Sequence, residues 1–188
     1  NPAGSAVSEE VKLTVVQPVV ILTQPEGETK LLGQALTLSV VASGSEPLVY
    51  QWHKGGGAIE GAKAKELVFE ALATTDAAAY TVSISNEAGT VESESAGITV
   101  HVPITITQQP EEARVIEGET TSFEVKAEGT EPIEYLWRFN SEVIDGATGA
   151  VLTVENASKA NEGSYQVVMK NPAGSAVSEE VKLTVVQP

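Results

Sequence analysis

Residues 36–56, LTLSVVASGSEPLVYQWHKGG, decide the fold of this chain. Apolar and polar residues alternate at the start of the stretch, a Gly-Ser-Glu-Pro run follows, and a second alternating run carries Tyr50 and Trp52. A period of two is typical of a half-buried β-strand, and Gly and Pro mark the loop between strands. The stretch therefore predicts two strands of an antiparallel sandwich, with Trp52 facing its core.

A related stretch, SFEVKAEGTEPIEYLWRFN, lies 85 residues further along the chain, at 122–140. The same offset of 85 relates Trp52 to Trp137 and Tyr80 to Tyr165. Two units of this length align without a gap, and each is long enough to bury its own core. We therefore expect one domain at 19–103 and a second at 104–188.

A longer period is also present in the sequence. The first 18 residues, NPAGSAVSEEVKLTVVQP, recur unchanged at 171–188, whereas the segment at 86–103 matches them at 8 of 18 positions. Segments one unit apart have therefore diverged, whereas segments two units apart are identical. This indicates a super-repeat of 170 residues. A deliberately duplicated strand is the alternative interpretation.

Alternating apolar residues recur at matching places in the two units. No stretch has a 3.6-residue period, so we expect almost no helix beyond a short turn before the sixth strand of each unit. The predicted inward faces hold Leu36, Leu38, Val40, Ala42, Tyr50, Trp52, Leu67, Phe69, Tyr80, Val82 and Ile84 in the first unit, and Phe123, Val125, Ala127, Tyr135, Trp137, Leu152, Val154, Tyr165, Val167 and Met169 in the second.

These motifs resemble the intermediate-type immunoglobulin domains, and most closely the cysteine-free, tandemly repeated version found in large bacterial surface proteins. The stretch 36–56 looks like that family's second strand, loop and Trp-bearing third strand. DAAAYTVSISNEAGTV at 76–91 and NEGSYQVVMKNPAGSAV at 161–177 look like its tyrosine corner, sixth strand and final hairpin. The resemblance covers both units and implies two all-β, immunoglobulin-like sandwiches of about seven to eight strands each.

The resemblance also assigns structural roles to particular residues. The family's two bridging cysteines fall on Val40 and Val82 in the first unit and on Val125 and Val167 in the second, so each core must rely on its tryptophan and aliphatic residues. Tyr80 and Tyr165 would fill the tyrosine-corner position. Ala78 stands where the family usually has Gly, and Asn161 stands where it has Asp.

The final hairpin of each unit carries an Asn-x-x-Gly motif. Asn86 with Gly89, and Asn171 with Gly174, fit a tight turn because Asn and Gly both tolerate positive φ. We therefore expect a hairpin into the last strand of each unit.

Composition argues against several function classes. The 11 basic and 26 acidic residues give a net charge of −15, which disfavours nucleic acid and anionic membranes as partners, and no apolar run is long enough to span a membrane. With no cysteine and no phosphate-loop, zinc-protease or nucleophile-elbow motif, no cofactor, metal or catalytic residue is predicted. His53 and His101 are expected to point into solvent. Calcium held by carboxylates at the joints, near Pro25, Pro110 and Pro188, remains an alternative.

The joints between units are short. Pro103 connects the last strand of one unit to the first strand of the next without a Gly/Ser linker, and Pro18 marks the equivalent joint before the first unit. This predicts a semi-rigid rod. Residues 1–18 align with the final hairpin strand of a preceding unit. They are either part of a continuous filament or a strand added to another copy.

The sequence thus predicts a non-catalytic structural repeat of a long bacterial extracellular fibre, stalk or cell-surface protein. Its partners would be adjacent immunoglobulin-like repeats or copies of itself. An adhesin repeat that binds a carbohydrate or protein, and a spacer in a large exported enzyme, are the alternatives. The adhesin would need exposed aromatic residues grouped at one end of a sandwich.

Overall fold

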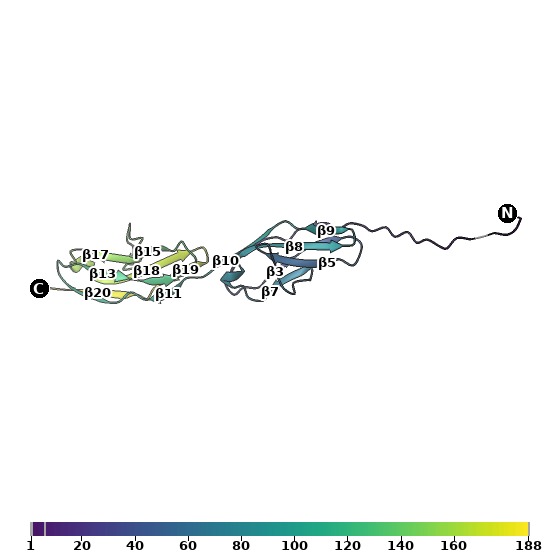
Figure 1. The fold of residues 1–188 in the computed structure, drawn as a ribbon. Coiled ribbons are helices and arrows are strands. Elements are labelled where there is room, and N and C mark those ends of the chain that lie inside the picture. Colours follow the sequence, from purple (N-terminus) through teal and green to yellow (C-terminus); the bar gives the residue numbers. More distant parts are fainter. Residues whose placement is uncertain (1, 6, 188) are drawn as a thin grey trace. The chain divides into compact units, whose positions relative to one another are not determined.

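The computed structural model of the chain describes residues 2–5 and 7–187. Asn1, Ala6 and Pro188, which the predicted segments 1–18 and 104–188 include, lie outside the described residues. The described chain is all-β, as predicted, with two single 3-10 turns and two sandwiches of the immunoglobulin type, mainly antiparallel but with a parallel pair β12–β20 in the second (Figure 1). No described helix has the length and apolar character needed to cross a membrane.

The first sandwich is built from β1 to β10. Its larger sheet has the order β2-β10-β8-β5-β6, with β9 also paired to β8, and it faces the pairs β1-β4 and β3-β7. The strands are β1 Val20–Thr23, β2 Glu28–Leu31, β3 Leu36–Ser39, β4 Val41–Ser43, β5 Val49–Lys54, β6 Gly57–Ala58, β7 Glu66–Phe69, β8 Ala78–Asn86, β9 Gly89–Glu92 and β10 Ala96–His101.

The second sandwich repeats this topology with β11 to β20. Its larger sheet has the order β12-β20-β18-β15-β16, with β19 also paired to β18, and its pairs are β11-β14 and β13-β17. The strands are β11 Thr105–Gln108, β12 Ala113–Ile116, β13 Thr121–Glu124, β14 Lys126–Glu128, β15 Glu134–Phe139, β16 Glu142–Val143, β17 Val151–Val154, β18 Gly163–Asn171, β19 Gly174–Val177 and β20 Val181–Val186.

Each sandwich has more strands than the seven to eight expected, because several long strands are interrupted. The last predicted strand, for example, is divided into β19 and β20 at Ser178. The Ser178 hydroxyl accepts a hydrogen bond from Val167 N at 3.0 Å and donates to Glu179 O at 2.8 Å. Ser93 makes the same two contacts, with Val82 N and Glu94 O. In both sandwiches, therefore, the side chain of a buried serine accepts a backbone hydrogen bond from the neighbouring strand at the point where the regular ladder is interrupted.

A short 3-10 turn precedes β8 and β18, where the sequence predicts one. The turns are η1 Thr74–Asp76 and η2 Lys159–Asn161. Asp76 Oδ2 accepts a hydrogen bond from Ala73 N at 2.9 Å, and Asn161 Oδ1 accepts one from Ser158 N at the same distance. Asn161 thus caps its turn with a neutral oxygen at the position where Asp76 uses a carboxylate.

The described residues divide into two compact units. The first contains residues 2–5, 7–28, 37–69 and 78–98, and the second contains 29–36, 70–77 and 99–187. The sheets join strands only within β1–β10 or within β11–β20. The boundaries 19–103 and 104–188 stay a prediction.

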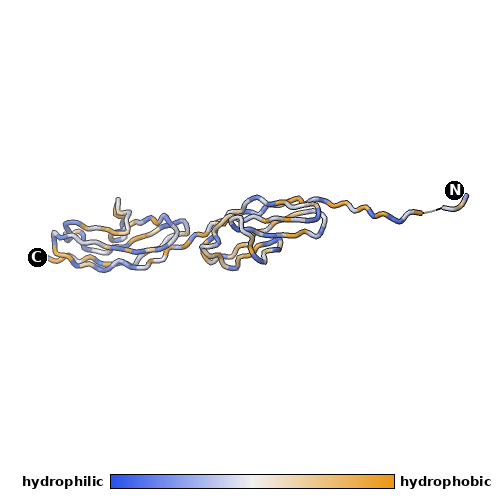
Figure 2. Tube along the Cα trace, viewed as in Figure 1, coloured by the Kyte–Doolittle hydropathy of each residue, from blue (hydrophilic) through white to orange (hydrophobic). Residues whose placement is uncertain are grey.

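The N-terminal segment differs from the expected hairpin strand. Residues 7–17 form no strand, although residues 177–187, which have the identical sequence, supply the end of β19 and all of β20. Apolar and polar residues alternate along this segment in Figure 2. The pattern needed for a strand is present, but a strand also needs a neighbouring strand with which to form its ladder.

Candidate functional site

The tryptophans and the four valines at the family's cysteine positions all lie inside the sandwiches. Trp52 and Trp137 are 0% exposed, and each indole Nε1 donates to a backbone oxygen, of Ala64 at 3.0 Å and of Gly149 at 2.9 Å. The valines Val40, Val82, Val125 and Val167 are also buried. Both cores are therefore closed by apolar packing around one indole whose polar atom has a partner.

The tyrosine-corner residues are buried beside phenylalanines. Tyr165 Oη donates to Asn161 O at 2.9 Å, which ties the start of β18 to η2. Its ring stacks on Phe123, with 4.7 Å between the centroids, while Tyr80 meets Phe69 edge-on at 5.5 Å. Burial raises the pKa of the Tyr165 hydroxyl. These rings add directional packing to each core.

The most distinctive polar site is a clamp on the backbone that leads into the first strand of each sandwich. In the second sandwich the Asn171 amide Nδ2 donates to Val102 O at 2.9 Å and to Thr130 O at 3.0 Å. Thr130 closes the clamp, because its Oγ1 accepts from Val102 N at 2.7 Å and its own N donates to Val102 O at 3.0 Å. Both backbone groups of Val102 are therefore held.

The first sandwich has the same clamp around Gln17. Asn86 Nδ2 donates to Gln17 O at 2.8 Å and to Ser45 O at 3.0 Å. Ser45 Oγ accepts from Gln17 N at 2.8 Å, and Ser45 N donates to Gln17 O at 3.1 Å. We call these two sets, Asn86 with Gln17 and Ser45 and Asn171 with Val102 and Thr130, the first-strand clamps.

A glycine makes each first-strand clamp possible. A Cβ added to Gly129 would lie 2.9 Å from Asn171 Nδ2 and 3.2 Å from Pro103 O. A Cβ on Gly44, whose φ is +156°, would lie 3.2 Å from Asn86 Nδ2 and 3.1 Å from Pro18 O. A Cβ at either position would crowd the clamp, so glycine favours this close approach. Pro18 and Pro103, predicted at the joints, thus lie directly after the clamped residues.

The clamp asparagines act differently from the prediction. Neither Asn86 nor Asn171 has positive φ; that conformation belongs to Gly89 and Gly174, at +139° and +142°. Instead the asparagine Oδ1 accepts from the backbone N two residues on, of Ala88 and Ala173, each at 2.9 Å. One side chain therefore shapes its hairpin turn and holds the incoming strand at once. Sequence reasoning found the residues but missed the second role.

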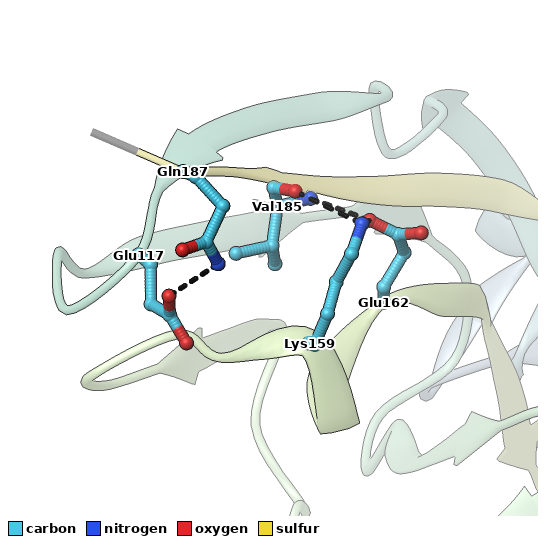
Figure 3. Close-up of polar contacts among 5 residues, drawn as sticks. All are labelled: Glu117, Lys159, Glu162, Val185 and Gln187. Atoms are coloured by element: carbon cyan, nitrogen blue, oxygen red, sulfur yellow. Dashed lines mark hydrogen bonds and ion pairs between the residues drawn. The ribbon is translucent and has the colours of Figure 1, made fainter.

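A second polar site holds the end of β20 (Figure 3). Lys159 Nζ donates to Glu162 Oε2 at 2.8 Å and to Val185 O at 3.3 Å, while Glu162 Oε2 accepts from Val185 N at 3.0 Å. Glu117 accepts a hydrogen bond from Gln187 Nε2. The Lys159 hydrogen bond, followed by the Val185 bond, lowers the pKa of the Glu162 carboxyl. We call Glu117, Lys159 and Glu162 the terminal-strand anchor.

The histidines differ from the prediction. His53 and His101 are only partly exposed, and each has a buried Nδ1 without a hydrogen-bond partner. Both residues therefore lie partly inside the protein surface rather than fully in solvent. Within residues 2–5 and 7–187, no three His, Asp or Glu side chains form a group that could hold a metal ion.

An open groove of about 480 Å³ lies over β15 and β18 of the second sandwich, and it is lined by Ile133, Glu134, Tyr135, Leu136, Thr148, Val168 and Lys170. The corresponding positions of the first sandwich include Gln51 and Ser83, in place of Leu136 and Val168. Only Tyr135 contributes an aromatic ring to this groove. The grouped exposed aromatic residues expected of an adhesin are not found at this groove.

Comparison with known proteins agrees with this architecture. Residues 104–185 match the immunoglobulin I-set domain. An I-set domain is therefore present in the second half of the chain. The chain is also similar to the titin I-band fragment I67-I69, with a TM-score of 0.69, 26% identity and coverage of 91% of this chain and 66% of that one.

Curated relatives come from animals and from a bacterium. The chain is 32% identical to mouse Hemicentin-2 over 198 residues, 100% of this chain and 4% of that protein. It is 29% identical to the muscle M-line assembly protein unc-89 of Caenorhabditis elegans, covering 98% of this chain and 2% of that protein. Endoglucanase C of Cellulomonas fimi is 29% identical over 90% of this chain and 16% of its own length. The chain therefore spans a small part of each of these relatives.

Proposed function

We propose that this chain is a non-catalytic structural repeat of a long extracellular bacterial fibre, stalk or surface protein, in which tandem sandwiches act as semi-rigid spacers. The first-strand clamp carries the proposal. Val102, whose N and O are both held, follows His101, the last residue of β10, without an intervening residue. A joint whose first residue after β10 is held at both of its backbone groups suits a spacer that keeps neighbouring repeats in a defined order and spacing.

The recurrence of the clamp supports a role in an array. The pairs Asn86–Gln17 and Asn171–Val102 are each 69 residues apart. Two sandwiches whose sequences have diverged elsewhere therefore use the same device on the strand that enters them. The curated relatives named above also match this chain over small fractions of their length, which is the pattern of a repeat within a large protein.

Single-molecule pulling on the 188-residue chain tests the spacer role. Each sandwich should unfold in one cooperative event, and each event should lengthen the chain by about 300 Å, from about 85 residues at roughly 3.6 Å per residue. Gradual lengthening without discrete events would contradict a role as independently folded mechanical spacers.

A second candidate is a spacer inside a large exported enzyme, favoured by the similarity to Endoglucanase C. This candidate relies on the same properties of the sandwiches as the fibre repeat does. The two candidates differ only in the domains on either side of the sandwiches. The sequence of the complete polypeptide distinguishes the two candidates. Further copies of the 170-residue repeat support the fibre, whereas a catalytic module on the same polypeptide supports the enzyme spacer. The adhesin alternative stays a prediction.

A further inference from the structure

Three apolar residues form a row across the outer face of the larger sheet in the second sandwich. Leu136 of β15 lies opposite Val168 of β18, which in turn lies opposite Val177 of β19. Leu136 and Val168 alternate along their strands with the fully buried Trp137 and Val167, so they lie on the outer face. Both line the groove over β15 and β18, and Val177 is 51% exposed. We call Leu136, Val168 and Val177 the apolar row.

The corresponding row of the first sandwich is polar. Gln51 lies opposite Ser83, and Ser83 lies opposite Glu92. Two of these side chains bond within their own sandwich, because Gln51 Nε2 donates to Ile59 O at 2.8 Å and Glu92 Oε1 accepts from Thr81 Oγ1 at 2.8 Å. The shared fold therefore does not require apolar residues at these positions. An exposed apolar strip bordered by polar groups is typical of an interaction surface.

Charged side chains of opposite sign flank the apolar row on β15. Glu134 precedes Leu136 by two residues and Arg138 follows it by two, so all three lie on one face of the sheet. Arg138 also has a buried Nε without a hydrogen-bond partner among the described residues. A rotation of 180° about the apolar row exchanges the positions of Glu134 and Arg138. The face is therefore complementary in charge to a second copy of itself.

From these observations we propose that the apolar row is the centre of a face-to-face interface between the second sandwiches of two copies of this chain. A two-fold axis along the row packs its three side chains against those of the other copy and pairs Glu134 with Arg138 twice. The net charge of −15 disfavours self-association in general, but the outward residues of β15 and β18 include one acid, Glu134, and two bases, Arg138 and Lys170. This inference goes beyond the spacer role, which stands if it fails.

Sedimentation velocity of the 188-residue chain tests the interface. The apolar row is small beside a standard interface, so we expect a dimer with a dissociation constant on the order of 100 µM. Val177→Glu introduces the residue that the first sandwich has at this position and should weaken the dimer by at least about 10-fold, because it buries an unpaired charge. Val151→Glu is the matched control. Val151 is 50% exposed on β17, outside the apolar row, and Glu66 occupies its position in the first sandwich.

Charge reversal tests the two-fold arrangement. Glu134→Arg and Arg138→Glu should each weaken the dimer by about 10-fold, because like charges then face each other across the axis. The double variant should restore the affinity to within about threefold of the unmodified chain, because opposite charges again face each other. NMR of the Trp137 indole N–H, which donates to Gly149 O, reports whether the second sandwich of each variant is folded.

Three results would overturn the proposal. An unmodified chain that stays monomeric at every concentration would show that a second copy does not bind this face. Equal weakening by Val177→Glu and Val151→Glu would show that the copies associate through another surface. A double variant with no more affinity than Glu134→Arg or Arg138→Glu alone would contradict the two-fold pairing of these residues.

Discussion

At the residue scale, each core has one fully buried indole and no covalent link between its sheets. Trp52 and Trp137 lie in the apolar interior, and each satisfies its polar atom with a backbone oxygen. A disulfide at the family's cysteine positions would contribute about 2–4 kcal/mol. Because valines occupy those positions, more of the stability of each sandwich depends on the aromatic core.

Replacing either tryptophan with alanine should destabilise its own sandwich by about 3–5 kcal/mol, through lost burial and the cavity left behind. Urea denaturation followed by circular dichroism measures this for Trp52→Ala and Trp137→Ala. The Phe variants serve as controls and should lose less, because most of the apolar volume remains. A loss below about 1 kcal/mol for either Ala variant would contradict the role of these residues in the core.

The Glu162 carboxylate links the stability of the second sandwich to pH. Hydrogen bonds from Lys159 and Val185 lower the pKa of Glu162 below its ordinary value of 4.5. The folded state therefore favours the ionised form. This stabilisation is fully present above pH 4.5 and is lost as the pH falls through the lowered pKa.

We expect Glu162→Gln to flatten the fall in melting temperature of the second sandwich on acidification from neutral pH to below 4.5. Calorimetry across this range measures the slope. The exposed Glu155→Gln variant is the control and should keep the slope of the unmodified chain. Equal slopes for the unmodified chain and Glu162→Gln would show that this carboxylate is not the source.

At the element scale, the hairpins between β8 and β9 and between β18 and β19 connect two parts of each sandwich. The first-strand clamp places a hairpin asparagine against the segment before the first strand, 69 residues away in sequence. In each sandwich, one asparagine side chain thus contributes both to the hairpin turn and to the contact with the segment before the first strand.

Asn171→Ala should cost the second sandwich about 1–3 kcal/mol, because it removes the Asn171 bonds to Val102 O, Thr130 O and Ala173 N. Asn86→Ala is the matched variant and should destabilise the first sandwich by a similar amount. Hydrogen exchange resolves the two sandwiches. If Asn171→Ala left the exchange of Ala173 N unchanged, the Asn171 side chain would not be the source of its protection.

The strands, the turns before β8 and β18 and the inward faces were accessible from the sequence because they depend on local periodicity and on Gly, Pro and Asn. The second role of Asn171 was not, because its partners Val102 and Thr130 are identified only once the sheets are assembled. The buried Ser178 was missed for a related reason. A serine in an alternating run reads as an outward residue, and only the ladder shows that its hydroxyl replaces a backbone partner. The partial burial of His53 likewise depends on neighbouring strands.

At the scale of the whole molecule, we propose that this chain is a structural spacer with a semi-rigid joint between its sandwiches. Val102, the first residue after β10, is held at both of its backbone groups by residues of the second sandwich. A clamp on the second sandwich should therefore restrict reorientation, whereas the equivalent clamp on Gln17 should have no effect on this joint.

Residual dipolar couplings of the 188-residue chain in a weakly aligning medium test this claim most directly. We expect the couplings of both sandwiches to fit one alignment tensor. We also expect Asn171→Ala to separate them into two tensors of different magnitude, while Asn86→Ala does not. Two independent tensors in the unmodified chain would contradict the account, because they would mean that the sandwiches reorient freely about the joint.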